Sequence, residues 1–286
     1  MDNFDLILRN AHVIDPEQEI NEVMDIAFSK GKIAALENGV AGSEDVLTKN
    51  LRGSIVTPGL IDMHTHVYWG GTSIGVDADL YSNSSAISTL VDTGSVGPGN
   101  FYGFKKHVIE KSCARILIYL HVSHAGIFAF SNRIMVGESE EMRLMDPETA
   151  IEIANANKDI IVGIKVRIGK WTSGLNGISP LEVALKVGEA CQLPVMVHID
   201  EPPPTYSEVV KHLRAGDILT HCFRGFPNSP ISKTGEVISE VLMARSRGVY
   251  FDVGHGSMSF SFDTARAMLA QDFYPDTISS DIHCLC

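Results

Sequence analysis

From residue 55 onward, continuous apolar runs alternate with amphipathic stretches along the chain. Such runs are typical of parallel strands buried on both faces, and the stretches between them, several beginning at Pro or Ser and ending at Gly, are typical of crossover helices. The eight runs are Ile55 to His64, Ala86 to Thr93, Ala114 to His121, Ile160 to Ile168, Leu193 to Ile199, Asp217 to Cys222, Val249 to Val253 and Thr277 to Asp281. Eight alternations predict an α/β protein with a (β/α)8 TIM barrel.

The first part of the chain has a different pattern. Residues 4–37 alternate apolar and polar side chains, as half-buried strands do, around a turn at Lys30-Gly31-Lys32. We therefore predict that residues 1–52 form part of a small β-sandwich and that residues 53–286 form the barrel. The sequence stops five residues after Asp281, so we expect a barrel that lacks its last helix and a small domain that is incomplete.

Two long segments, residues 68–85 and 126–145, interrupt the alternation of strands and helices. Each follows a predicted strand. Long ordered loops at the strand ends of such barrels usually cover the active site. We expect both loops to lie over the mouth of the barrel.

Composition narrows the class of partner. The 35 acidic and 23 basic residues give a net charge of −12, which argues against nucleic acid because a phosphate backbone requires a basic stripe. No apolar segment approaches the roughly 18 residues that span a bilayer, and the start has no signal-peptide pattern, so we expect a soluble cytoplasmic protein without a membrane partner. The five cysteines predict no disulfide, and the CxC of Cys284 and Cys286 is expected to be a frayed tail rather than a metal site.

A His-Thr-His sequence closes the first apolar run. His64 and His66 are two residues apart at a strand end, so their side chains point to the same face at the barrel mouth, where two imidazoles can share a metal ion. The pair alone is as consistent with chance as with a metal site. The strand from Thr57 to Asp62 leads directly into it, and this favours the metal site because barrel enzymes keep reactive groups at this end.

Histidines also close the fifth and sixth runs. His198 is the next-to-last residue of PVMVHI, and His221 is the next-to-last residue of DILTHC. Either one alone is more simply a hydrogen-bonded core residue. Together with the His-Thr-His pair they place four imidazoles at one barrel face, which predicts a metal centre because imidazole is the commonest ligand of zinc and similar ions. The set also suits manganese, cobalt or iron, and zinc is the default.

Three charged residues join these candidates. Burial within GIKVRIG favours the neutral amine of Lys165, which either reaches the mouth, pairs with a carboxylate, or captures carbon dioxide as a carbamate that bridges two metals. Arg167 shares its face and either holds a substrate carboxylate or forms a structural ion pair. Asp281 ends the eighth run, where a carboxylate is usually only a cap but can also bind a metal and accept a proton from water.

The combined motifs resemble a known superfamily. PGLIDMHTH, with Lys165, His198, His221 and Asp281 on later strands, is similar to the binuclear amidohydrolase superfamily. HTHVYWGGTS, VDTGSVGPGNF, HVSHAGI, MVGESEEMRLMDPE and GIKVRIG resemble its amidohydrolase/deacetylase branch, whose members are often labelled dihydroorotase-like. The likeness covers nearly the whole chain.

This resemblance implies a role for each ligand. A Lys165 carboxylated by carbon dioxide would bridge two divalent ions, taken as zinc. The more buried ion would be held by His64, His66 and Asp281, and the other by His198 and His221. Asp281 would be the general base, passing a proton to the leaving group after a metal-bridging hydroxide, formed from water with a pKa of about 7, attacks the carbonyl.

The resemblance also implies the substrate class. Members of the branch remove acetyl groups from small N- or O-acetylated carboxylic acids, so we expect hydrolysis of an amide or ester of a small acylated carboxylic acid. Arg167, Tyr68 and Trp69 are candidate substrate-binding residues. His124 and His255 lie near strand ends and are candidates for contacting substrate or holding loops.

Two alternatives remain open. A cyclic amidase of the dihydroorotase or hydantoinase type would use the same metal centre to open a ring amide. An inactive, truncated metal-binding scaffold would keep the ligands without turnover. Apolar surface left beside the first and eighth strands by a missing helix would favour a homo-oligomer.

Overall fold

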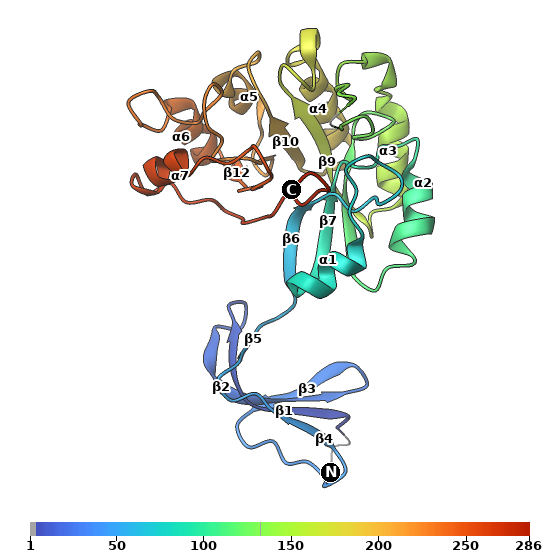
Figure 1. The fold of residues 1–286 in the computed structure, drawn as a ribbon, viewed down its shortest axis with the longest axis vertical. Helices are drawn as coiled ribbons and strands as arrows, with labels where there is room; N and C mark the ends of the chain where they lie inside the picture. The colour runs from blue at the N-terminus through green and yellow to red at the C-terminus, as the bar shows by residue number, and fades with distance from the viewer. Residues whose placement is uncertain (1–3, 132) are drawn as a thin grey trace. The chain divides into compact units, whose positions relative to one another are not determined.

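The structure, a computed structural model, describes residues 4–131 and 133–286. The chain divides into two compact units, Met1–Leu60 and Ile61–Cys286 (Figure 1). We predicted a boundary between residues 52 and 53. The boundary follows Leu60 instead, because β5 (Ile55–Val56) pairs with β1 (Leu6–Asp15) and so belongs to the first unit.

The first unit is built on one sheet. Its other strands are β2 (Ile20–Ser29), β3 (Lys32–Glu37) and β4 (Leu47–Asn50). β2 pairs antiparallel with β1 and β3, whereas β4 and β5 pair parallel with β1. The β2–β3 turn places Lys30 and Gly31 at φ angles of 52° and 73°, the positive values that a tight hairpin favours.

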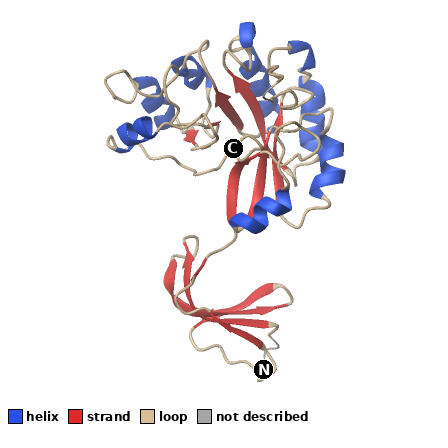
Figure 2. Cartoon of the chain, viewed as in Figure 1, coloured by secondary structure: helices blue, strands red, loops and turns tan. Residues whose placement is uncertain are grey.

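The second unit is built on a curled parallel sheet of seven strands (Figure 2). In chain order the strands are β6 (Leu60–Thr65), β7 (Ile87–Thr93), β8 (Arg115–His121), β9 (Ile161–Ile168), β10 (Val195–Ile199), β11 (Ile218–Leu219) and β12 (Tyr250–Phe251). Each strand neighbours the next one along the chain. This is the strand order of the predicted (β/α)8 barrel.

The eighth predicted strand, Thr277 to Asp281, is not a regular strand. It is attached to both edges of the sheet by isolated parallel bridges, from Asp252 to Thr277 and from Thr65 to Ile282. The N–H of Asp281 also donates to the carbonyl of His64 at 2.8 Å. Asp281 has a φ angle of 53°, which interrupts the extended backbone and explains why no continuous ladder forms. The segment nevertheless lies between β12 and β6 and connects the two ends of the sheet.

Helices connect the strands and cover the outer side of the curled sheet (Figure 1). They are α1 (Ala78–Ser85), α2 (Phe101–Phe104) continuing into a π-helical turn (Lys105–Ile109), α3 (Pro147–Ala156), α4 (Ser179–Cys191), α5 (Tyr206–His212), α6 (Ser239–Ser246) and α7 (Phe262–Leu269), with short 3-10 turns at Met142–Leu144 and Gly174–Asn176. Side-chain oxygens cap several of them, including the capping box of Thr205 and Glu208 on α5. Within the described residues, no helix combines the length and apolar composition needed to cross a membrane.

Alternation along β9 and β10 decides which side chains face the barrel interior. Val195 and Val197 pack in the large cluster that the strands share with the helices, whereas Met196 packs in a separate cluster with Val91, Tyr119 and Ile218. Lys165 is the register partner of Met196, and Arg167 is that of His198. Because register partners share a face of a sheet, these polar side chains project to the interior side, beyond Met196 toward the strand ends.

Candidate metal centre

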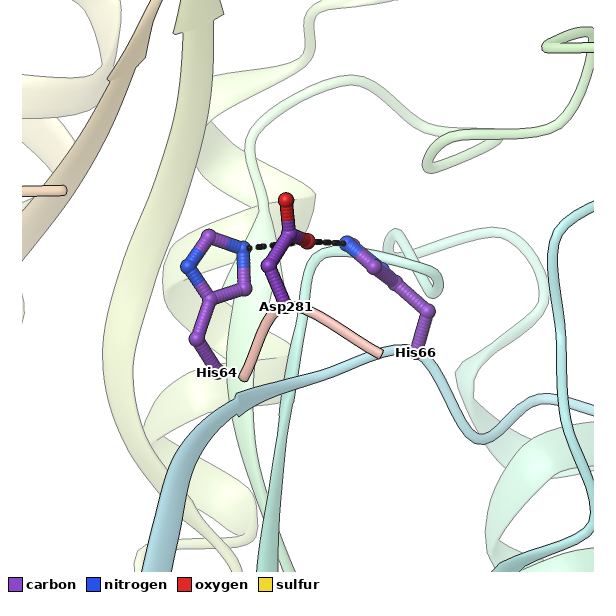
Figure 3. Close-up of side chains that lie close together, drawn as sticks. All are labelled: His64, His66 and Asp281. Atoms are coloured by element: carbon purple, nitrogen blue, oxygen red, sulfur yellow. Dashed lines mark hydrogen bonds and ion pairs between the residues drawn. The ribbon is translucent and has the colours of Figure 1, made fainter. Parts of the chain in front are cut away.

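Three buried side chains converge where β6 ends against the eighth segment (Figure 3). The Oδ1 atom of Asp281 lies 3.2 Å from His64 Nε2 and 3.1 Å from His66 Nε2. One possible ligand atom from each of the three residues lies within 4.8 Å of the others. Gly256 leaves room for this carboxylate, because a Cβ atom there would lie 2.5 Å from Asp281 Oδ2. The geometry therefore fits one divalent ion held by two imidazoles and a carboxylate.

A second pair of imidazoles lies beside the first group. His198 Nδ1 is 2.7 Å from His221 Nε2, and His221 Nε2 is 4.0 Å from Asp281 Oδ2. The His64 and His221 rings have centroids 5.2 Å apart. His198 Nε2 is buried and has no hydrogen-bond partner among the described residues. The structure thus brings together the four histidines that the sequence analysis placed at one barrel face.

Lys165 lies at the same place. Its side chain is fully buried, and its Nζ atom is 3.5 Å from His64 Nε2. Burial lowers the pKa of this amine to about 7; nearby Arg167 lowers the pKa further, while Asp281 raises it. A substantial fraction of Lys165 is therefore neutral near pH 7, which is the form that can react with carbon dioxide.

The protonation states at this site suit a metal ion. Burial lowers the pKa of His64, lowers that of His198 well below its usual value, and lowers that of His221 to about 3. Burial by itself raises the pKa of Asp281, but the neighbouring imidazoles outweigh it and hold that pKa well below its usual range. Neutral imidazoles and an ionised carboxylate are the forms that bind metals, so the residues present fit the predicted ions.

Arg167 has a partner that the sequence analysis did not identify. Its Nη1 atom lies 3.5 Å from Glu138 Oε2, its guanidinium lies 4.7 Å from the centre of the Phe130 ring, and Glu138 Oε1 is 3.3 Å from His121 Nε2. All three polar side chains are buried. Because Glu138 and Phe130 belong to the segment 126–145, this loop lies over Arg167, as expected of a loop that covers the site. The signal for Glu138 was its place in the MVGESEE motif.

The sequence analysis also did not identify a second arginine near the site, Arg224. Arg224 follows His221 by three residues, and its buried Nε atom has no hydrogen-bond partner among the described residues. Its Nη1 atom lies 3.5 Å from Ser259 Oγ. Arg224 and Arg167 both lower the pKa of His198, so both guanidiniums lie near the metal ligands. Nothing in the local sequence RGFPNS distinguished Arg224 from a surface arginine.

Two of the predicted substrate-binding residues, Tyr68 and Trp69, line a cavity that does not include the metal ligands. Tyr68 packs on Phe104 with ring centroids 4.7 Å apart, and Trp69 is 66% exposed. Both line a cavity of about 460 Å³ beside α1 and the π-helical turn, and none of the six predicted ligands lines it. Their role in substrate binding remains a prediction that this geometry does not favour.

The remaining candidate residues are the histidines His124 and His255 and the two cysteines of the terminal CxC. His124 is exposed, and His255 is exposed and stacks on Phe260 with centroids 4.8 Å apart. The CxC segment is hydrogen-bonded rather than frayed, because Cys284 N–H donates to Ile74 O at 3.0 Å. Both thiols contact backbone carbonyl oxygens.

Comparisons with known proteins agree with this geometry. No family model matches the chain. A deacetylase of Agrobacterium fabrum (Atu3266) is 35% identical over 253 residues, covering 88% of this chain and 61% of the relative. A deacetylase of Brucella anthropi is also 35% identical, over 260 residues, covering 91% of this chain and 64% of the relative. The chain therefore spans less than two thirds of the length of these two relatives.

This chain also resembles a solved structure, and it covers a larger share of that protein than of the two deacetylases. The crystal structure of a dihydroorotase superposes with a TM-score of 0.87 at 32% identity, covering 97% of this chain and 73% of that one. The likeness extends over both compact units and includes the barrel strands that carry the histidines.

Proposed function

The chain belongs to the amidohydrolase/deacetylase family of the amidohydrolase superfamily, and we propose that it is a binuclear metal-dependent hydrolase that removes the acyl group from a small acylated carboxylic acid. One observation carries this proposal: the Asp281 carboxylate lies among the imidazoles of His64, His66 and His221. The amine of Lys165, whose pKa is lowered to about 7, lies beside His64 in the same cluster. Without a bound cation, burying so many polar groups would cost free energy and contribute little to the stability of the fold.

Each ligand has an assigned place. His64, His66 and Asp281 would hold one divalent ion, and His198 and His221 would hold a second. Lys165, carboxylated by carbon dioxide, would contact both. When bound, such ions polarise a carbonyl group and lower the pKa of water toward about 7. The donor set suits zinc as well as other divalent metals.

Asp281 is assigned the transfer of the proton. Its Oδ1 atom faces the imidazoles of His64 and His66, whereas Oδ2 lies on the other side of the carboxylate, 4.0 Å from His221 Nε2. Because its pKa is held low, Asp281 is ionised at neutral pH and can accept a proton from the attacking water. Oδ2 would then return this proton to the leaving group.

The carboxylate of the substrate is assigned to the arginines. Arg167 is fixed by Glu138 and covered by Phe130, and Arg224 offers a buried Nε atom without a partner among the described residues. A guanidinium in such a position can bind a carboxylate through charge-assisted hydrogen bonds. The names of the two deacetylase relatives support an acetylated substrate.

A cyclic amidase is the second candidate, favoured by the likeness to a dihydroorotase. Purified protein loaded with zinc or manganese should be assayed with O-acetyl and N-acetyl carboxylic acids, and with dihydroorotate and hydantoins. We expect turnover of the acetylated acids, and Asp281→Asn should lower kcat by about a hundredfold or more while metal remains bound. Turnover of the ring amides alone would establish the second candidate, and bound metal without turnover of either class would establish a non-catalytic metal-binding protein.

A further inference from the structure

Two buried carboxylates that the proposed reaction does not use lie behind the His-Thr-His pair. Asp252 follows β12 and is fully buried. Its Oδ2 atom accepts hydrogen bonds from Thr220 Oγ1 at 2.8 Å and Ser279 Oγ at 2.7 Å, and its Oδ1 atom accepts one from Thr277 Oγ1 at 2.7 Å. The Thr220 hydroxyl in turn lies 2.9 Å from His64 Nδ1. A chain of contacts therefore runs from Asp252 through Thr220 to His64.

The chemistry of this chain fixes the direction of each hydrogen bond. An ionised carboxylate only accepts, so the single hydroxyl proton of Thr220 must point to Asp252. The Thr220 oxygen can then only accept from His64, which places a proton on His64 Nδ1. In a neutral imidazole the lone pair is then on Nε2. This is the atom 3.2 Å from Asp281 and 3.5 Å from Lys165.

The second histidine of the pair has the same arrangement on a different strand. His66 Nδ1 lies 3.0 Å from the Ser95 hydroxyl. Ser95 follows β7 and hydrogen-bonds the fully buried carboxylate of Asp92 through its N–H, at 2.9 Å, and through its hydroxyl. Asp92 also accepts from Val67 N at 2.8 Å, which fixes its position. His66 is thus held with Nε2 facing Asp281, 3.1 Å away.

We propose that Thr220 with Asp252, and Ser95 with Asp92, are positioning pairs that hold His64 and His66 as Nδ1–H tautomers with both Nε2 lone pairs facing the metal position. His221 is held the same way by the backbone, because its Nδ1 lies 2.7 Å from the carbonyl of Gly254. The inference rests on the proposed metal centre, because in the metal-free chain an Nε2–H of either histidine could instead donate to the Asp281 carboxylate. Partners of this kind commonly change metal affinity by about 10- to 100-fold.

Thr220→Val tests the inference because valine keeps the shape of threonine and removes the hydroxyl. Metal dissociation constants, measured by competition with a chromophoric chelator, should rise about 10-fold or more in this variant, and Thr220→Ser should restore them to within about threefold of the unaltered protein. Thr277→Val is the matched control, since it removes another hydroxyl that donates to Asp252, at Oδ1, without touching His64. It should leave metal affinity unchanged.

Equal losses in Thr220→Val and Thr277→Val, or no loss in Thr220→Val, would overturn the inference. Nitrogen-15 NMR of the zinc-loaded protein gives a second readout, because the shifts of the two ring nitrogens report which one carries the proton. We expect a proton on His64 Nδ1 and none on Nε2; a proton on His64 Nε2 in the zinc-loaded protein would contradict the proposal. If Thr220→Val does not fold, Ser95→Ala with Ser95→Thr provides the same comparison at His66. Bound metal, weakened metal affinity in Thr220→Val and no turnover of any acyl substrate would disprove the proposed function and leave this inference standing.

Discussion

The Nδ1 atom of His198 and the Nε2 atom of His221 lie 2.7 Å apart. Since His221 Nδ1 faces the carbonyl of Gly254, its proton is on that side, and His198 must donate the hydrogen bond between the two rings. A divalent ion placed between the rings would take the place of this proton, which would then be carried by His198 Nε2, the other nitrogen of the neutral ring. Metal binding at this pair is therefore coupled to a change of tautomer at His198, without net release of a proton.

Replacement of one member of this pair should remove one ion. We expect His198→Ala to lower the metal content from two ions per chain to one, because His64, His66 and Asp281 remain to hold the other. His124→Ala is the control, since His124 is an exposed histidine. Elemental analysis of dialysed protein measures the outcome, and two retained ions in His198→Ala would contradict the assignment.

The metal-free protein should lose stability as the pH falls. The pKa of His221 is lowered to about 3 in the folded chain, whereas an unfolded histidine has a pKa of about 6.5. The unfolded state therefore binds more protons between these values, so the free energy of unfolding decreases as pH drops below about 6.5, by up to about 1.4 kcal/mol per pH unit for this group. Urea unfolding of chelator-treated protein at several pH values measures the slope. His221→Gln should reduce it, and an unchanged slope would count against the assignment.

Replacement of Lys165 should separate stability from metal binding. Lys165→Met keeps an unbranched side chain of similar length and removes a buried amine. We expect the unfolding free energy of the metal-free protein to stay the same or rise by about 1 kcal/mol, because a buried ionisable group is replaced by an apolar one. Metal content and turnover should both fall sharply, and a variant that retained two ions would exclude Lys165 as a bridging ligand.

Sequence patterns predicted most of the barrel and the place of its ligands, and the exceptions have physical causes. Apolar runs such as Ile160 to Ile168 became strands because both faces are buried, and ligands at strand ends share a barrel face in any regular barrel. The eighth run failed as a strand because Asp281 adopts a left-handed backbone conformation, which its residue type alone does not reveal. Glu138 and Arg224 were missed because their contacts depend on the path of loops, which periodicity does not encode.

Arg224 should affect the binding of charged substrates selectively. Arg224→Gln should raise KM for an acetylated carboxylic acid by about tenfold or more, because a charge-assisted hydrogen bond is lost. KM for the corresponding uncharged amide should not change. Arg266→Gln is the control, since Arg266 pairs with the exposed Asp263 and lies over the exposed Phe262 ring, both on α7. Equal effects on the charged and uncharged substrates would show that Arg224 acts through structure rather than through the carboxylate.

Arg167 and Glu138 should behave as one unit in stability measurements. Their ion pair is buried, with side-chain exposures of 8% and 5%, so removal of one partner leaves the other buried without its opposite charge. We expect Glu138→Gln and Arg167→Met each to lower the free energy of unfolding by about 3 kcal/mol. The double variant should be more stable than the sum of the two losses predicts, because no isolated charge remains in the interior. Chemical unfolding of the four proteins gives the coupling energy directly, and additive losses would mean that Glu138 does not hold Arg167 in place.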